Sequence, residues 1–305
     1  MTLLVNEIHV REHLQKGLII LAADRRITVK GAFHSNRKKL FEIPYLNAGV
    51  GYFGLAQVNQ TEFLSSWLPN FIGRTCDATG LEEFSNRLCD DLNRTVNKRL
   101  LAKEPSGFHI CGYNNDNYPE LWFIRSFLRM EGDIYKGLQT EYCISEDFLA
   151  RDAREQGFNG ADPGVSNSFI QYYVNGDTRA FHSVWLRLDD FLAEMFSYAD
   201  FKHSRQASDL EMIAKWKMGV ISSFYGQFAE KRIIGTPIDA CVLLPKKVGW
   251  KRSGLHTLPA TTERASRTGP GRQRVCNWDS DRDTMQMWHR MPQEPAKVDS
   301  VYSHI

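Results

Sequence analysis

The sequence predicts an α+β protein, a four-layer αββα sandwich in which two antiparallel sheets lie between layers of helices. Three observations predict this fold. Residues 2–10 and 17–23 read as a hairpin, and the second segment is a continuous apolar run, typical of a strand buried on both faces. Two amphipathic helical stripes follow this hairpin. A second hairpin, at residues 108–112 and 120–124, comes next and supplies strands for a second sheet.

The segment between the hairpins holds two short strands and two helices. The strands are predicted at residues 40–43 and 45–50. Apolar side chains recur on one helical face over residues 55–71 and again over 81–100. Residues 79–82 read Thr-Gly-Leu-Glu, a capping box that marks the start of the second helix.

The second half of the domain adds more helices and a closing strand. Residues 184–199 are predicted to be helical. Residues 208–211 form another capping box, which opens a helix with apolar positions over 213–228. Residues 236–244 complete the predicted fold as a strand.

The composition changes after residue 244. Residues 245–305 are rich in Pro, Arg, Ser, Gly and Asp and show little periodicity, as disordered segments do. A short helix near residues 283–291 is the one element expected there. We therefore expect one domain over residues 1–244, followed by a low-complexity, disordered tail over residues 245–305.

The composition argues against several classes of function. Hydrophobic residues make up 42% of the chain and charged residues 24%, and the net charge of +2 indicates neither a nucleic-acid nor a membrane partner. The six cysteines form no CxxC pair, so neither zinc nor a disulfide framework is indicated. We expect no metal and no cofactor. Charged residues interrupt the N-terminal segment where a signal peptide would be apolar, and no apolar run reaches the ~20 residues of a membrane helix. We expect a cytoplasmic protein.

A candidate nucleophile lies at the N-terminus. Thr2 follows Met1, and a threonine that becomes the first residue has a free α-amine beside its hydroxyl. The reference pKa of that amine is ~7.7–8.0, so it can accept the hydroxyl proton near neutral pH. Asp24, Lys39 and the glycines within residues 49–54 follow in order. Each has an ordinary structural explanation when taken singly, and together they could form one catalytic site.

Local stretches of the chain carry a family resemblance. They are LIILAADRRIT (18–28), KLFEI (39–43), GYFGLAQ (51–57), FHICGYNNDNYPELWFI (108–124) and GTPIDACVL (235–243). In this order they resemble the proteasome β-subunit family of N-terminal nucleophile (Ntn) hydrolases, which includes bacterial proteasome-like peptidases. The resemblance covers residues 2–244 and implies the Ntn-hydrolase form of the sandwich.

The resemblance implies a role for each candidate. Thr2 would be the nucleophile, exposed by removal of the initiator methionine. Lys39 would lower the pKa of the α-amine and stabilise the oxyanion, and Asp24 would hold Lys39 through a charge-assisted hydrogen bond. The backbone N–H of Gly51 would form the oxyanion hole, with Gly49 as the less favoured alternative.

The resemblance also implies how a substrate would bind. The backbone of Thr28 would pair with an extended peptide by strand addition. Ile27, Arg37 and Phe53 match positions around the specificity pocket and give it a mixed apolar and basic lining. The implied substrate is a peptide or an unfolded protein, and the implied assembly is a homo-oligomeric ring. The sequence identifies no ATPase partner.

Two other functions stay open. The family's later serine and aspartate have no clear counterpart: Lys231 falls where the acid is expected, and Ser166 and Ser168 are loose candidates for the serine. The segment from Thr2 to Asp24 is also longer than the family usually has, so a slip of the hairpin would move Thr2 away from the site. These departures favour a non-catalytic structural subunit of a proteasome-like assembly. A small-molecule amidase of the same fold is the third hypothesis.

Overall fold

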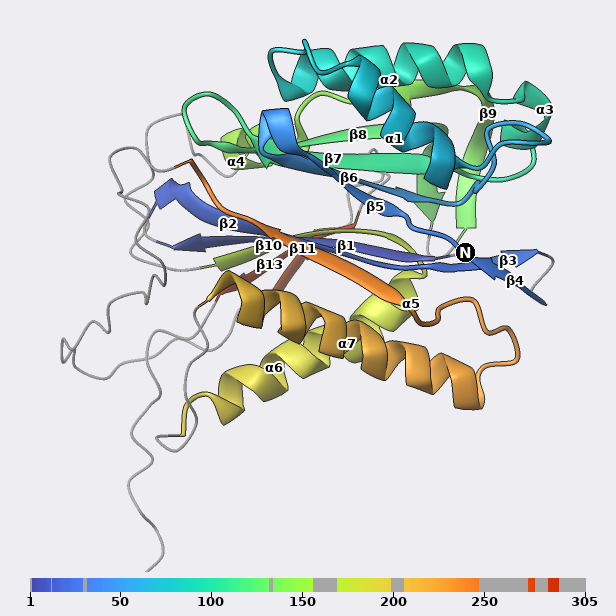
Figure 1. Cartoon of the computed structure of the whole chain (residues 1–305). Coiled ribbons are helices and arrows are strands. Elements are labelled where there is room, and N and C mark those ends of the chain that lie inside the picture. Colours follow the sequence, from blue (N-terminus) through green and yellow to red (C-terminus); the bar gives the residue numbers. More distant parts are fainter. Residues whose placement is uncertain are drawn as a thin grey trace, which may run out of the picture.

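The structure is a computed structural model that describes residues 2–11, 13–29, 32–131, 134–155, 169–198 and 206–246, with two further strands at 274–277 and 285–290. It is an α+β protein built from antiparallel sheets and helices, as the sequence predicts. Two large sheets lie face to face, and helices cover the outer face of each (Figure 1). Within the described ranges, no helix combines the length and apolar character needed to cross a membrane.

The first large sheet has six strands in the order β11-β2-β1-β10-β13-β12. These strands are β1 (Leu3–Arg11), β2 (His13–Asp24), β10 (Phe169–Gly176), β11 (Ile238–Leu243), β12 (Arg274–Asn277) and β13 (Met285–Arg290). Three helices lie on the outer side of this sheet (Figure 1), namely α5 (Thr178–Ala180), α6 (Leu186–Met195) and α7 (Ala207–Phe228). A π-helical turn, Phe181–Trp185, joins α5 to α6.

The second large sheet has five strands in sequence order, β5-β6-β7-β8-β9. They are β5 (Leu40–Ile43), β6 (Ala48–Phe53), β7 (Gly107–Tyr113), β8 (Pro119–Glu131) and β9 (Ile134–Ile144). The helices α1 (Leu64–Arg74) and α2 (Leu81–Thr95) lie on its outer face, while the short helices α3 (Lys98–Leu101) and α4 (Phe148–Glu155) lie near its ends. Strands β3 (Arg26–Val29) and β4 (Ala32–Asn36) form a separate ribbon beside the N-terminus (Figure 1).

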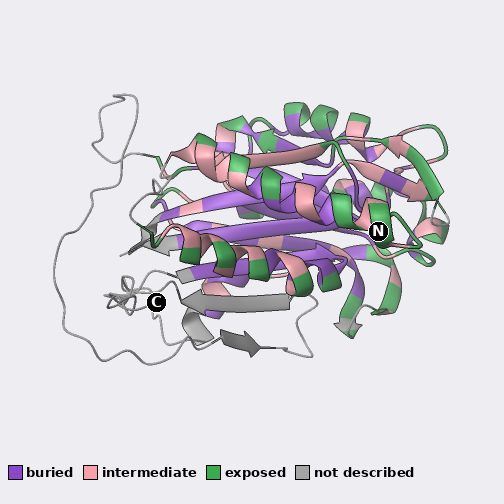
Figure 2. Ribbon diagram, turned by 90° about the horizontal axis from the view of Figure 1, so that it is seen from below, coloured by how far each residue is buried: buried purple, intermediate pink, exposed green. Residues whose placement is uncertain are grey.

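Side chains of β1 alternate between two cores because both faces of this strand are covered. Leu4 and Ile8 belong to the core between the two sheets. Leu3 and Val5 belong to the core that the six-stranded sheet forms with α6 and α7. Figure 2 shows the strands between the layers buried along most of their length, whereas the helices are buried on one side only. Burial on both faces explains the continuous apolar run in β2.

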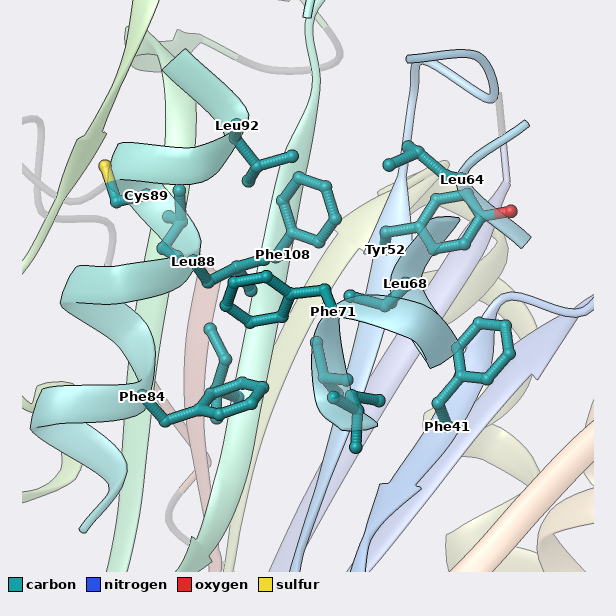
Figure 3. Packing of buried hydrophobic residues seen from close by; sticks show 14 of the residues in the cluster. Phe41, Tyr52, Leu64, Leu68, Phe71, Phe84, Leu88, Cys89, Leu92 and Phe108 are labelled. Atoms are coloured by element: carbon teal, nitrogen blue, oxygen red, sulfur yellow. The ribbon is translucent and has the colours of Figure 1, made fainter. Parts of the chain in front are cut away.

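The third core lies between α1, α2 and the outer face of the five-stranded sheet (Figure 3). Phe71 of α1 and Phe84 of α2 meet edge to face with 5.4 Å between ring centroids. Phe108 of β7 packs in the same cluster. The two apolar stripes predicted from the sequence therefore do face a sheet.

The first predicted helix begins later than its apolar stripe. The stripe starts at residue 55, but α1 starts at Leu64. The side chain of Asn59 accepts hydrogen bonds from the backbone N–H groups of Thr61 and Glu62, both at 2.9 Å. This local turn satisfies backbone groups that a helix would otherwise use, and so it delays the helix.

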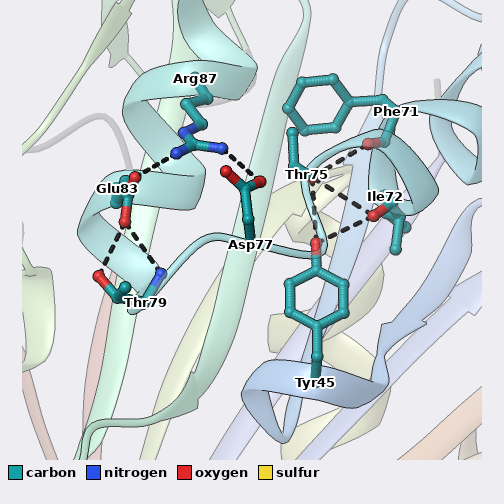
Figure 4. A network of polar contacts seen from close by, with 8 residues as sticks. All are labelled: Tyr45, Phe71, Ile72, Thr75, Asp77, Thr79, Glu83 and Arg87. Atoms are coloured by element: carbon teal, nitrogen blue, oxygen red, sulfur yellow. Dashed lines mark hydrogen bonds and ion pairs between the residues drawn. The ribbon is translucent and has the colours of Figure 1, made fainter.

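The capping interaction of α2 also differs from the prediction. The predicted partner of Thr79 was Glu82, but the N–H and hydroxyl of Thr79 donate to the carboxylate of Glu83 at 2.9 and 2.8 Å (Figure 4). Gly80 is the residue that caps the helix. Arg87 joins Glu83 to Asp77, so that the turn before α2 is held by charged side chains.

One ionic cluster is buried beneath α7. Lys217 donates to Glu7 of β1 at 2.5 Å and to Asp189 of α6 at 2.7 Å. Glu7 also accepts from the indole of Trp185 at 2.7 Å. Desolvation opposes the charge on Glu7, but Lys217 and the hydrogen-bonded His9 together more than offset it and hold the pKa of this carboxyl below its usual range. The cluster joins the six-stranded sheet to both of its long helices.

Several predicted elements are wrong or incomplete. The strand predicted at residues 45–50 is instead β6, which begins at Ala48 after a 3₁₀ turn at Pro44–Leu46. The capping box predicted at 208–211 does not start a helix, because α7 begins directly after Gln206. The short helix expected near 283–291 is instead the strand β13, which pairs with β10. The rest of the predicted tail, apart from β12 and residues 245–246, lies outside the described residues.

Candidate active site at the start of the first strand

Thr2, Asp24 and Lys39 meet at one end of the sandwich. The Lys39 ammonium donates to Thr2 Oγ1 at 2.5 Å and to Asp24 Oδ2 at 3.3 Å. The Thr2 hydroxyl donates to Asp24 Oδ1, and the same oxygen accepts the N–H of Leu3 at 3.0 Å. The three predicted catalytic side chains are therefore in direct contact.

The two sheets contribute different parts of this site. Thr2 immediately precedes β1 and Asp24 ends β2, so pairing of these strands brings the two residues together. Lys39 immediately precedes β5 and reaches the site from the opposite sheet. The long first hairpin does not disturb the site, because its irregularity falls between His9 and Arg11, at the far end of the pair.

The site is buried, and its charges are paired. Thr2, Asp24 and Lys39 are 2%, 0% and 2% exposed. Burial lowers the pKa of Lys39, and the nearby Asp24 carboxylate opposes this shift. Lys39 also donates to the carbonyl of Arg26 at 2.6 Å, so each of its three N–H bonds has an acceptor. Such complete pairing is what a buried ammonium requires.

A second segment fixes the backbone of Thr2. The N–H of Asp177 donates to the Thr2 carbonyl at 2.9 Å. Gly176 precedes it with φ of +98°, and its own N–H donates to the hydroxyl of Tyr135 at 3.0 Å. The Asp177 carboxylate accepts from Tyr225 at 2.6 Å and from Arg179 at 3.1 Å. Asp177 therefore supports the site through its backbone and caps α5 with its side chain.

Sequence reasoning missed Asp177. Its only local signal is the run Asn-Gly-Asp-Thr, a turn with a helix cap, which has many possible uses. Lys231, which occupies the place expected for an acid, is exposed, and Ser166 and Ser168 lie outside the described residues.

The predicted oxyanion donor, Gly51, is an interior residue of the five-stranded sheet. Gly51 lies within β6 and is buried against Leu4. Tyr52 donates its N–H to the carbonyl of Lys39, so antiparallel alternation turns the N–H of Gly51 away from β5 and towards His109 of β7. The alternative, Gly49, is also an interior residue of β6, packed against Leu21. Both N–H groups belong to the sheet.

Gly54 is the glycine of this cluster that lies outside the sheet. It follows the end of β6, is exposed, and has φ of +80°. A Cβ at this position would lie 1.9 Å from the carbonyl oxygen of Pro105, so only glycine fits. The predicted glycine turn is present, and residue 54 is the position in it where the backbone conformation and the nearby Pro105 carbonyl require glycine.

The predicted substrate residues divide into two groups. Ile27 and Thr28 lie on β3, which pairs with β4 and with no other strand of the described chain. Thr28 is half-buried, and the guanidinium of Arg37 lies 4.1 Å above the ring of Phe63. Phe53 is different: it is a core residue between the sheets, rather than a residue lining an open pocket.

A buried histidine ties the two sheets together behind the site. His109 of β7 contacts Asn6 of β1 through Nδ1, and Asn175 of β10 through Nε2 at 3.0 Å. Burial lowers the pKa of His109 to about 3, so the ring is neutral at physiological pH. A neutral ring donates at one nitrogen and accepts at the other, so one of the two amides must present its oxygen.

Comparison with known proteins identifies no relative of this chain. No protein-family model matches this chain, and no curated protein matches it. Among the described residues, no group of three or more His, Cys, Asp or Glu side chains is placed to hold a metal ion.

Proposed function

We propose that this chain is a threonine-type peptidase with the Ntn-hydrolase fold, similar to proteasome β-subunits. The observation that carries the proposal is the contact of one buried ammonium, that of Lys39, with both the Thr2 hydroxyl and the Asp24 carboxylate. This contact puts a positive charge directly beside the hydroxyl that would act as the nucleophile, where it can stabilise a developing negative charge. Removal of Met1 would place a free amine on the same residue.

The chemistry follows from these groups. The α-amine of Thr2 accepts the hydroxyl proton while Oγ1 attacks the carbonyl carbon of the scissile bond. The resulting ammonium gives that proton to the leaving nitrogen as the C–N bond breaks, which leaves an ester on Thr2. Water then attacks the ester with the amine again as base, and the free carboxylic acid and Thr2 are released. Lys39 stabilises the negative charge that develops on Oγ1.

We also propose Gly54 in place of Gly51 as the oxyanion donor. Gly49 lies against Leu21, which pairs with Asn6, while Gly51 lies against Leu4. Moving along β6 therefore leads from the level of Asn6 towards Thr2, and Gly54, an exposed residue, comes directly after the strand ends. An N–H outside the sheet is free to bind an oxyanion.

The substrate on this proposal is an extended peptide or unfolded segment. The edge of β3 opposite β4 has no strand partner among the described residues, which supports strand addition at Thr28. The half-buried Arg37 and the apolar Ile27 are the proposed specificity residues. Assembly of several copies into a ring is part of the same proposal.

The competing proposal is a non-catalytic subunit, which the burial of Thr2 favours. A peptide epoxyketone distinguishes the two, because it needs a hydroxyl and a free amine on one residue. We expect mass spectrometry to find the adduct on an N-terminal peptide that begins at Thr2. Thr2→Ala, which also permits Met1 removal, should stay unlabelled and assemble normally. A folded wild-type sample that retains Met1 and takes no label would favour the non-catalytic subunit.

A further inference from the structure

Two arginines lie opposite each other where the β3–β4 ribbon joins the rest of the chain. Arg25 comes before β3 and Arg37 comes after β4, and the N–H of Arg37 donates to the Arg25 carbonyl at 2.8 Å. The Arg25 guanidinium is neutralised by Asp239, to which Nε donates at 2.8 Å and Nη2 at 2.5 Å. Arg37 forms no ion pair with any described residue, and its buried Nε has no hydrogen-bond acceptor. Arg37 therefore lacks the carboxylate that its neighbour has.

The ring of Phe63 holds the Arg37 guanidinium in place. The central carbon of the guanidinium lies 4.1 Å from the centre of the ring, a cation–π contact. Stacking covers one face of the guanidinium, while its N–H groups, which lie in the plane, remain able to donate to a ligand. The terminal nitrogens of the half-buried Arg37 form no hydrogen bond with the described residues and are not buried. This arrangement suits a carboxylate, which can accept two parallel hydrogen bonds.

The surroundings of Arg37 carry positive charge that no nearby carboxylate offsets. The sequence contains no Asp or Glu between Asp24, which is engaged within the buried site, and Glu42. Lys38 is exposed beside Arg37 and forms no ion pair with a described residue. The same holds for Glu62, the acid that comes just before the stacking ring. A ligand complementary to this surface is anionic.

The backbone holds Arg37 at a fixed place beside the candidate nucleophile. Arg37 is two residues before Lys39, whose ammonium donates to the Thr2 hydroxyl. Tyr52 anchors this segment, because its hydroxyl donates to the Lys38 carbonyl and its N–H to the Lys39 carbonyl, both at 3.1 Å. Two extended residues span about 7 Å at most, which is also the span of two residues of an extended substrate. We therefore expect a substrate side chain that reaches Arg37 to lie within about two residues of the scissile bond.

We propose that Arg37 binds an acidic side chain of the substrate, so that this chain cleaves peptides within about two residues of an Asp or Glu. The inference rests on the proposed peptidase function and names its substrate class. The same cation repels a Lys or Arg at that position of the substrate. The preference therefore has an attractive and a repulsive part.

Cut sites in a denatured protein of known sequence, mapped by mass spectrometry, test this preference. Asp or Glu should lie within two residues of the cuts several times more often than their frequency in that protein predicts. A short peptide made from a preferred site should be cleaved roughly tenfold faster, in kcat/KM, than the same peptide with Gln in place of Glu, because Gln has nearly the same size but no charge. Arg37→Gln should bring this ratio to about one. Arg37→Lys keeps the charge but loses the planar fork, and should retain part of the ratio.

Arg74→Gln is the matched control. Arg74 is exposed in the last turn of α1, whereas Phe63 comes just before the first turn, so this variant removes the same charge at the far end of the helix. It should leave the ratio of the two rates unchanged. Circular dichroism of all three variants establishes that they are folded.

Two outcomes would overturn the inference and leave the peptidase standing. They are equal rates for the Glu and Gln peptides, and an equal ratio in the wild type and in Arg37→Gln. If the wild type cleaves nothing, fluorescence anisotropy of labelled peptides that differ only in Glu or Gln replaces the rates. Tighter binding of the Glu peptide that Arg37→Gln removes would support the acidic site in a non-catalytic subunit. Equal affinities would overturn it.

Discussion

The carbonyl oxygen of Thr2 lies directly against the α-carbon of Gly176, so that a Cβ added at residue 176 would be 1.7 Å from it. The end of β10 and the start of β1 are therefore in backbone contact. The position of the candidate nucleophile depends on the absence of one side chain.

Gly176→Ala should disturb the site more than the small size of the added methyl group suggests. The clash with Thr2 and the φ of +98° should together cost about 2 kcal/mol or more of stability and displace Thr2, so that epoxyketone labelling is lost. Gly73→Ala is the control, because nothing lies within 4 Å of its added Cβ; it should be neutral or slightly stabilising. Urea unfolding and labelling measure both effects, and normal labelling of Gly176→Ala would contradict this account.

Lys39→Met should lower the rate of peptide hydrolysis by at least about a hundredfold and should also destabilise the fold. Loss of the ammonium leaves Asp24 as a buried, uncompensated charge, at a cost on the order of 3–5 kcal/mol. The double variant Asp24→Asn/Lys39→Met should regain part of that stability and none of the activity. If Lys39→Met alone retains hydrolysis, Lys39 has only a structural role.

His109 should make the fold sensitive to acid. The pKa of this ring is about 3 in the folded chain and ~6.5 when unfolded, so between these values the unfolded state binds more protons. Stability should therefore fall as pH decreases from 6.5 towards 3, by roughly 1.4 kcal/mol per pH unit from this group. His109→Asn should flatten the dependence, and exchange of the exposed His34 for Asn should not. Equal slopes in all three proteins would refute the assignment.

Lys217 and Lys215 offer a comparison of buried and exposed ion pairs on one helix. Lys217→Met leaves Glu7 and Asp189 buried without their cation, and should cost about 3–5 kcal/mol. Lys215→Met removes a solvent-exposed pair with Glu211, and should cost under about 0.5 kcal/mol. Chemical denaturation of both variants checks the difference. Similar costs would mean that water reaches the cluster beneath α7.

Local patterns were sufficient to predict much of the fold. The apolar run of β2, the helical stripes of α1 and α2, and the hairpin of β7 and β8 each bury the face that the sequence indicates. Their signals are local because each segment contains its own periodicity. The contact of Asp24 with Lys39 could be anticipated only through the resemblance, since it depends on how two sheets align.

The missed features depend on partners far away in the chain. Whether the N–H of Gly51 or Gly54 is free is decided by the register of β6 with both neighbours. The strand β13 is defined by its pairing with β10, more than a hundred residues earlier. Asp177 is a surface-turn residue by sequence, and only the end of β10 brings it to Thr2.

Because Thr2 and Asp24 come from one sheet and Lys39 from the other, the contacts within the site depend on how the two sheets are aligned. A slide of one sheet over the other would separate the Lys39 ammonium from the Thr2 hydroxyl while leaving the hydrogen bonds within each sheet intact. Substitutions deep between the sheets, at Phe123 for example, should then reduce labelling of Thr2 before they unfold the protein. Reactivity at the N-terminus would in that way report on the packing of the whole interior.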